Sequence, residues 1–244
     1  MSFQPISAFL LFPGMILMLE VGRRLRGRRA SMEGIGAIEG AVFGLFGLLL
    51  ALTFTGSVSR FDNHRLLLTE ETNDIGTAYL RLDLLPPPVQ PELRQLFREY
   101  TNSRLHLFDA VGPEVSPETV RLQNEIWQRS VAAASSTGAN LDATKLLLPA
   151  LNNMIDITST RRNAFNMHPP ALVYLLLFAF SCGCAFMAGY SIKMGDRDWV
   201  YSIALAATVT LTIYATLEIE YPRKGLIRLT NLDQNLIALR DSMQ

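Results

Sequence analysis

The sequence has few of the residues from which catalytic and metal sites are usually built. Among 244 residues there are two cysteines and three histidines. Cys182 and Cys184 are two positions apart in an apolar stretch, so on a helix they point in different directions. The histidines, His64, His106 and His168, are far apart in the sequence. No nucleophile elbow, phosphate-binding loop or zinc-binding helix motif is present. We therefore expect no enzyme, no metal site and no cofactor.

Charge is also scarce. Only 18% of the residues are charged and the net charge is zero, whereas soluble domains carry about 25% charged residues. Because nucleic-acid binding requires a basic face, we expect no nucleic-acid partner. The charges are concentrated in residues 58–169, and three long stretches have almost none. This distribution is typical of a membrane protein with an extramembrane domain.

Four stretches are long and apolar enough to cross a lipid bilayer, which takes about 20 residues. They cover residues 5–22, 35–58, 170–192 and 198–218. The first is not a signal peptide, because its positive charges follow the apolar run instead of preceding it. A short polar turn around Gly195 and Asp196 makes the last two an antiparallel hairpin. We predict an all-α integral membrane protein with four transmembrane helices.

The segment between the second and third spans is predicted to be helical. Its apolar residues recur near helical spacing at Phe61, Leu68, Ile75, Tyr79 and Leu82. The second span is therefore expected to continue unbroken into a projecting helix, which the prolines at positions 86–88 end. The predicted organisation is a first transmembrane hairpin (1–58), a helical extramembrane domain (59–169), a second hairpin (170–221) and an amphipathic C-terminal tail (222–244).

Arginine and lysine in short loops favour the cytoplasmic side. The first loop and the turn before the fourth span carry such residues: Arg23, Arg24, Arg26, Arg28, Arg29, Lys193 and Arg197. In a four-span protein both loops lie on one side. The counts predict a multi-pass protein of a bacterial inner membrane, with both termini and the extramembrane domain on the outer side.

The second span carries polar and small residues with two interpretations each. Gly36, Gly40 and Gly44 form one face, where helices can approach closely, either within the chain or as a subunit contact or narrow pore wall. Glu39 either serves ion or proton passage or pairs at the membrane interface near the arginines. Hydroxyls end this span at Thr53, Thr55, Ser57 and Ser59, and line one face of the fourth span at Thr208, Thr212 and Thr216. They either bond to the preceding turn of backbone or line a water-filled path.

An acidic group follows on the projecting helix. Glu70, Glu71 and Asp74 lie close in sequence to Arg65 and Arg81. Paired carboxylates are suited to a divalent cation or to tuning conduction. A solvated face with local ion pairs is the simpler interpretation.

The run from Leu49 to Leu85, LLALTFTGSVSRFDNHRLLLTEETNDIGTAYLRLDLL, resembles the bestrophin-like domain family, which comprises bacterial and plant membrane proteins of unassigned function. Its most specific part extends from Ser59-Arg60-Phe61-Asp62 to Tyr79-Leu80-Arg81. The trailing segment Glu220-Tyr221-Pro222-Arg223-Lys224-Gly225 supports the resemblance. The same stretch is similar to the part of bestrophin anion channels where the second helix leaves the membrane.

This resemblance implies a homo-oligomer that conducts an inorganic ion, and a pentamer is the assembly that bestrophins form. In bestrophins the second helices line a pore with a hydrophobic neck, which makes Phe43, Phe46, Leu50 and Phe54 the neck candidates here, with Glu39 and Ser57 as further path-lining candidates. Our leading hypothesis is therefore an oligomeric ion channel whose second span lines the path. The alternative is a structural or sensory membrane protein whose helical domain binds a partner, without transport.

Overall fold

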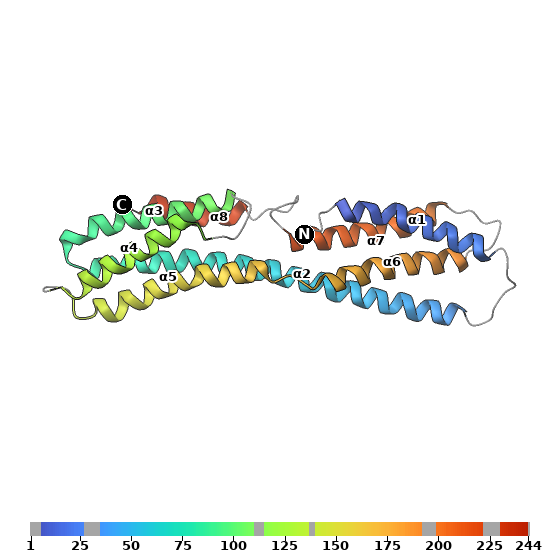
Figure 1. Cartoon of the computed structure of the whole chain (residues 1–244), viewed down its shortest axis with the longest axis horizontal. Helices are drawn as coiled ribbons and strands as arrows, with labels where there is room; N and C mark the ends of the chain where they lie inside the picture. Colours follow the sequence, from blue (N-terminus) through green and yellow to red (C-terminus); the bar gives the residue numbers. More distant parts are fainter. Residues whose placement is uncertain are drawn as a thin grey trace. The chain divides into compact units, whose positions relative to one another are not determined.

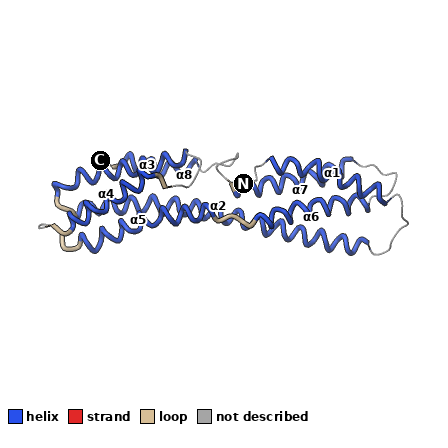
Figure 2. The backbone as a smooth tube through the Cα atoms, in the orientation of Figure 1, coloured by secondary structure: helices blue, strands red, loops and turns tan. Residues whose placement is uncertain are grey.

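A computed structural model describes residues 6–26, 35–109, 115–136, 140–191, 199–221 and 230–243. In these ranges the chain is α-helical with two short 3-10 helices and no strand (Figure 2). The chain divides into two compact units. Unit 1 comprises Met1–Phe61 and His168–Ile227, and unit 2 comprises Asp62–Met167 and Arg228–Gln244. Several residues used for the predicted orientation, hairpin and family resemblance lie outside the described ranges: Arg28, Arg29, Lys193, Gly195, Asp196, Arg197 and Pro222 to Gly225.

Unit 1 contains α1 (Ile6–Arg26), the first part of α2 (Ile35–Leu80), α6 (Ala171–Ser191) and α7 (Trp199–Glu220). Figure 1 shows α1 beside α6 and α7, and both contacts are extensive. One apolar cluster holds these helices together, with Met15, Phe46, Leu177, Cys184 and Ile213 among its buried members. All four helices contribute to this core, although most of α2 remains outside it.

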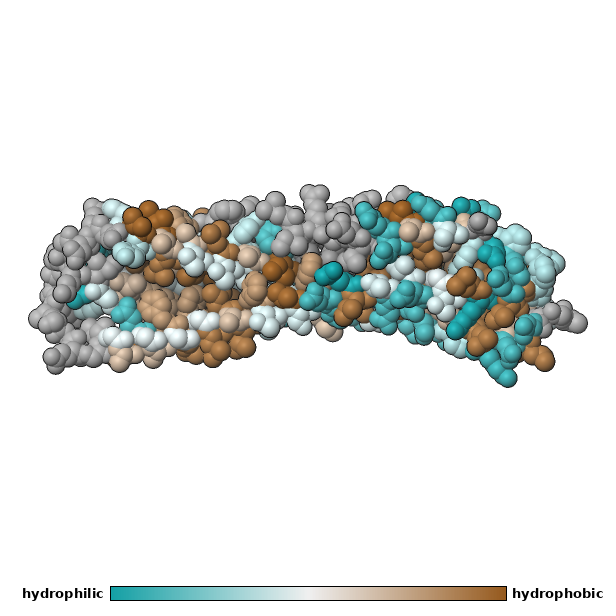
Figure 3. Space-filling view, turned by 180° about the vertical axis from the view of Figure 1, so that it is seen from behind, coloured by the Kyte–Doolittle hydropathy of each residue, from teal (hydrophilic) through white to brown (hydrophobic). Residues whose placement is uncertain are grey.

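Three helical segments have the length and apolar composition to cross a membrane: Gly36–Leu84, Ala143–Ser191 and Trp199–Glu220. They contain the predicted second, third and fourth spans. Helix α1, the predicted first span, is 21 residues long but is not one of the three segments. Brown, hydrophobic residues cover much of the visible surface of unit 1, whereas teal, hydrophilic residues are more frequent on unit 2 (Figure 3). By the composition of its helices, the chain fits a multi-pass membrane protein.

Helix α2 is a single helix of 46 residues. This confirms that the second span continues into the following segment without a break. A 3-10 turn, η1 (Arg81–Leu84), ends it, and Leu85 then adopts an extended conformation with φ −86° and ψ 157°. The residue before a proline is restricted in this way, so Pro86 explains the end of the helix.

Unit 2 packs the second part of α2 with α3 (Gln90–Asp109), α4 (Pro117–Ala134), α5 (Ala143–Asn166) and α8 (Thr230–Ser242). A second 3-10 turn, η2 (Pro87–Val89), precedes α3. At the start of α4, the hydroxyl of Ser116 accepts a hydrogen bond from the backbone N–H of Thr119 at 3.0 Å, and Pro117 occupies the first turn. Both features favour a helix start. Helix α8 lies against α3, so the C-terminal segment belongs to unit 2.

Candidate functional site

The inner face of α2 in unit 1 is formed by residues three or four positions apart. Phe46 is buried in the core of the unit, and Phe43 and Leu50 pack partly buried against the same core. Thr53 and Ser57 continue this face and are also buried. Five of the predicted path-lining residues therefore contact other helices of their own chain: Phe43, Phe46, Leu50, Ser57 and, through the hydrogen bond described below, Glu39. Their assignment to a path stays a prediction, and the packing gives them a structural role.

The opposite, outer face of α2 in unit 1 is not covered by the described residues. Its exposed large side chains are Ile38, Leu45, Leu48 and Leu52. Only 11% of the most apolar part of this segment is buried, against 28% and 33% for the segments that contain α6 and α7. Of the predicted path-lining residues, Phe54 alone is exposed, at the edge of the inner face. Helix α2 is thus the least enclosed of the three apolar segments.

The predicted packing glycines are on the open part of α2. A methyl group added to Gly36, Gly40 or Gly44 would meet no described atom within 4 Å. Packing within one chain is therefore not observed at these positions among the described residues, and the subunit contact or narrow pore wall stays a prediction. The tight glycine contacts lie elsewhere, where Gly22 of α1 faces the backbone of α6 and Gly189 of α6 faces that of α1 at Leu19.

Glu39 lies where α2 faces the end of α6. Its carboxylate accepts a hydrogen bond from the hydroxyl of Ser191 at 2.5 Å. Arg26 of α1 donates to the backbone carbonyls of Tyr190, at 3.0 Å, and of Ser191. Arg23 and Arg24 both pair with Glu20 on their own helix. The described arginines near the first loop therefore bond to groups of α1 and α6, and the Glu39 carboxylate bonds to the Ser191 hydroxyl.

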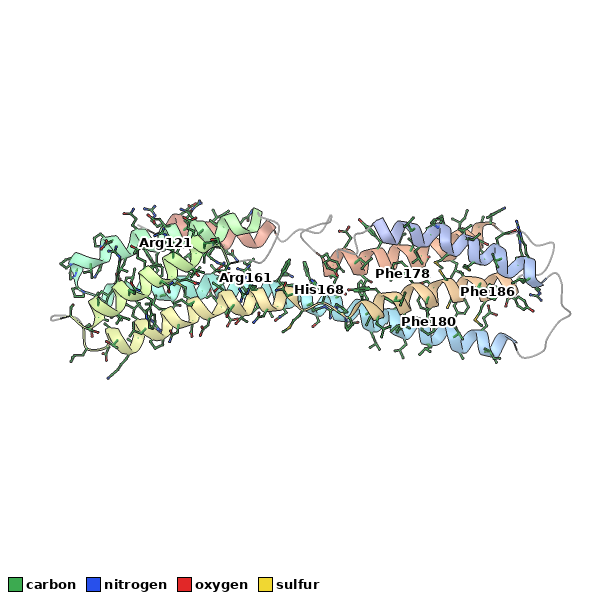
Figure 4. The ribbon with its side chains drawn as sticks, viewed as in Figure 1. Arg121, Arg161, His168, Phe178, Phe180 and Phe186 are labelled. Carbon is green, nitrogen blue, oxygen red and sulfur yellow. The ribbon has the colours of Figure 1, made fainter. Side chains whose placement is uncertain are left out.

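The other end of unit 1 holds a charged cluster around Glu220, whose side chain is almost fully buried. Arg60 of α2 donates to both carboxylate oxygens, with Nε 3.0 Å from Oε1 and Nη2 2.7 Å from Oε2. His168, labelled in Figure 4 just before α6, places Nδ1 3.0 Å from Oε1. Ser57 lies 3.3 Å from Nη2 of Arg60. The cluster joins α2, α7 and the segment that leads into α6.

Sequence reasoning missed this cluster although one signal was available. Glu220 ends an apolar segment, and a carboxylate there requires a partner because its isolated burial is costly. Arg60 and His168 are far from it in sequence, so spacing alone does not identify them as the partners.

Unit 2 holds a second buried charged cluster. Glu71 of α2 is fully buried and pairs with Arg104 of α3, at 2.5 Å, and with Arg161 of α5 (labelled in Figure 4). Burial lowers the pKa of the Arg104 guanidinium below its ordinary value. The interpretation of Glu71 as part of a solvated face is therefore wrong, because its partners come from two other helices. Among the described residues, no three His, Cys, Asp or Glu side chains are grouped to hold a metal.

Three hydroxyls of the apolar helices, on Thr53, Thr212 and Thr216, bond to backbone, as one of the two interpretations predicted, whereas the Ser57 hydroxyl accepts from Arg60. Thr53 donates to the carbonyl of Leu49 at 2.7 Å. On α7, Thr212 and Thr216 donate to the carbonyls four positions earlier, each at 2.8 Å. Threonine side chains commonly satisfy themselves in this way on a helix.

These features define a class, that of all-helical membrane proteins with a charged helical bundle outside the apolar helices. The family model of the Bestrophin-like domain matches residues 8–231, and the chain belongs to this family. The match covers all three apolar segments, most of unit 2 and both charged clusters. No curated protein and no solved structure shows significant similarity to the chain.

Proposed function

We propose that this protein is a homo-oligomeric ion channel in which the α2 helices of several copies surround the conducting path. The observation that carries the proposal is the uncovered outer face of α2, which continues along the whole apolar part of the helix. Glycine faces favour helix contacts in lipid because backbones can approach closely there. Gly36, Gly40 and Gly44 of α2 have no such partner among the described residues of the chain.

The residues proposed to line the path differ from the neck candidates. Successive residues turn by about 100° around a helix, which places Ala37, Gly44, Leu48 and Thr55 near the middle of the outer face. All four are exposed in the single chain. Their side chains are small or apolar, and Leu48 is the largest, so it forms the constriction. The aromatic rings of the inner face serve as the support against which this helix is held.

The proposed topology has four spans, with α1 crossing beside α6 and α7. Its close backbone contact with α6 at Gly22 and Gly189 is suited to neighbouring helices in lipid. Four spans put both termini on one side of the membrane. The basic short loops favour a bacterial inner membrane with unit 2 on the outer side.

Cysteine accessibility in liposomes tests the path. The free thiols Cys182 and Cys184 are first replaced by alanine, and flux of chloride and of potassium is measured. A charged thiol reagent should block the Leu48→Cys and Thr55→Cys variants. It should leave the Phe46→Cys variant unaffected, since that position is buried in the core of unit 1.

Two results would count against the proposal. If the reagent blocked ion flux in the Phe46→Cys variant alone, the path would have to lie along the inner face of α2. A parent protein that passes neither ion over a range of pH and calcium concentrations would exclude conduction and favour the structural or sensory alternative.

A further inference from the structure

The outer face of α2 also remains uncovered in unit 2. Leu66 and Leu80 are 68% and 69% exposed there, and Asn73, midway between them, is exposed as well. We call these three residues the outer stripe. The residues that α2 buries in unit 2, such as Glu71, Ile75 and Ala78, lie on the opposite side of the helix. The outer stripe thus occupies the middle of the exposed side.

The spacing of the outer stripe is that of a helix-pairing seam. Its members are seven positions apart, which is the spacing of one of the two seam positions that keep a helix against a parallel partner. A single asparagine within such a seam fixes the register of the helices. The amide of Asn73 can both donate to and accept from the same amide in another copy. The outer stripe is therefore complementary to itself.

The flanking charges fit the same arrangement. Arg65 precedes Leu66 and Glu70 follows Leu66 by four positions, so they take the two positions that border a seam. In a parallel pair of helices, the bordering position that Arg65 occupies lies opposite the one that Glu70 occupies on the neighbouring helix. Arg65 would then face Glu70 of the other copy with opposite charge. The Arg65 side chain is exposed, and its ion pair with Asp62 is loose, at 3.6 Å, so it is accessible for this contact.

We propose that the outer stripe binds the outer stripe of a second copy of this chain, in parallel and in register. The proposal rests on the proposed homo-oligomer that spans a membrane, because copies in one bilayer share their orientation and their α2 helices run parallel. It adds an interaction surface outside the apolar part of α2. Lipid tails do not cover exposed leucines on a helix that has left the bilayer, whereas the same leucines of another copy do.

Disulfide crosslinking of the full-length protein in membranes tests the contact. In the background lacking Cys182 and Cys184, the variant Asn73→Cys is oxidised with copper–phenanthroline. The control is Arg98→Cys, at an exposed position of α3. Dimers should form at least roughly 10-fold faster in the Asn73→Cys variant, because association raises the effective concentration of the two thiols. Equal rates, or no dimer in either variant, would overturn the proposal.

Charge exchange provides an independent test. Arg65→Glu and Glu70→Arg should each slow crosslinking through position 73, since each places like charges opposite one another. The double exchange should restore the rate, which a loss of folding would not do. If the double variant stays as slow as the single variants, the parallel pairing is wrong.

The two proposals fail in different ways. If position 73 crosslinks but the protein passes no ions, the channel proposal is wrong and the proposed contact between outer stripes still stands. If the protein passes ions, and the thiol reagent blocks the Leu48→Cys variant, but position 73 does not crosslink, the contact proposal is wrong and the channel proposal still stands.

Discussion

Arg60 and Glu220, 160 positions apart, form a two-pronged ion pair in which the guanidinium donates to both carboxylate oxygens. Each belongs to one of the segments that carry the family resemblance, Ser59-Arg60-Phe61-Asp62 and Glu220-Tyr221 with the residues that follow. The pair gives these distant segments a common role. Together they fasten the end of α7 to α2, with His168 as a third member.

Removing one partner of this pair should destabilise the protein more than removing both. Arg60→Met leaves a buried carboxylate, and Glu220→Leu leaves a guanidinium without its acceptor, whereas the double variant leaves neither. We expect the double variant to unfold at a higher temperature than either single variant in detergent. Arg24→Met, which removes an exposed arginine from the pair with Glu20, should change the midpoint little. Additive effects of the two substitutions would contradict the prediction.

Glu71→Gln should destabilise unit 2 strongly. The substitution leaves two guanidiniums, of Arg104 and Arg161, without the carboxylate between them. Loss of one partner from a buried ion pair costs about 3–5 kcal/mol. The measurement is the free energy of unfolding from denaturant titration, followed by helical circular dichroism.

The matched control for this experiment is Glu92→Gln, which breaks an exposed pair with Arg129. Exposed pairs contribute little to stability, so its unfolding curve should overlay that of the parent. A Glu71→Gln variant as stable as this control would show that the buried cluster is dispensable.

Gly189→Leu should disrupt the packing of α1 on α6. A side chain at Gly189 would collide with the backbone of α1 at Leu19, and overpacking of this kind costs about 1–3 kcal/mol. The control is Gly183→Leu on the same helix, where a methyl group meets no described atom within 4 Å. Thermal unfolding in detergent should separate the two variants, and equal midpoints would refute the close contact.

Alkaline pH should destabilise unit 2 through Tyr100. Burial raises the pKa of its hydroxyl above the ordinary value of 10.0, and the hydroxyl lies 3.4 Å from the carbonyl of Met154. Above about pH 10 the unfolded chain loses this proton while the folded chain keeps it, which favours unfolding by up to about 1.4 kcal/mol per pH unit. The contribution is fully present below pH 10 and is lost as the pH rises through the folded pKa.

Comparing the dependence of stability on pH in two variants checks this prediction. The Tyr100→Phe variant should lose less free energy of unfolding than the parent protein as the pH rises from neutral to alkaline. Tyr201→Phe, at an exposed position, should keep the slope of the parent. The slope is the relevant quantity because the lost hydroxyl also changes stability at neutral pH. Identical slopes for all three proteins would exclude Tyr100 as the titrating group.

Features that depend on residues close together in the sequence could be predicted from the sequence. The start of α4 is one example, because Ser116 and Pro117 favour a helix start through local contacts. The unbroken α2 was accessible for the same reason, since no proline interrupts it. The packed side of α2 was not accessible. Apolar and small residues occur all around its first part, so only the packing of unit 1 reveals that Phe46 is buried and Leu48 exposed.

The charged clusters could not be predicted from the sequence, for a related reason. Glu71 has Arg65 and Arg81 as its nearest cations in sequence, but the structure pairs it with Arg104 and Arg161 from two other helices. Sequence spacing describes one helix surface at a time. A partner supplied by another helix is determined by the packing of the core, to which Tyr100 and Leu151 belong.

The two hydrogen bonds from Arg26 to the last carbonyls of α6 give this residue a capping role. A cation at the C-terminus of a helix satisfies unpaired carbonyls and favours the helix dipole. Substituting Arg26 to test membrane topology would therefore also fray the end of α6, and the two effects would be confused. Arg24, whose side chain is 78% exposed, is the arginine whose charge can be reversed to report on topology while the end of α6 stays closed.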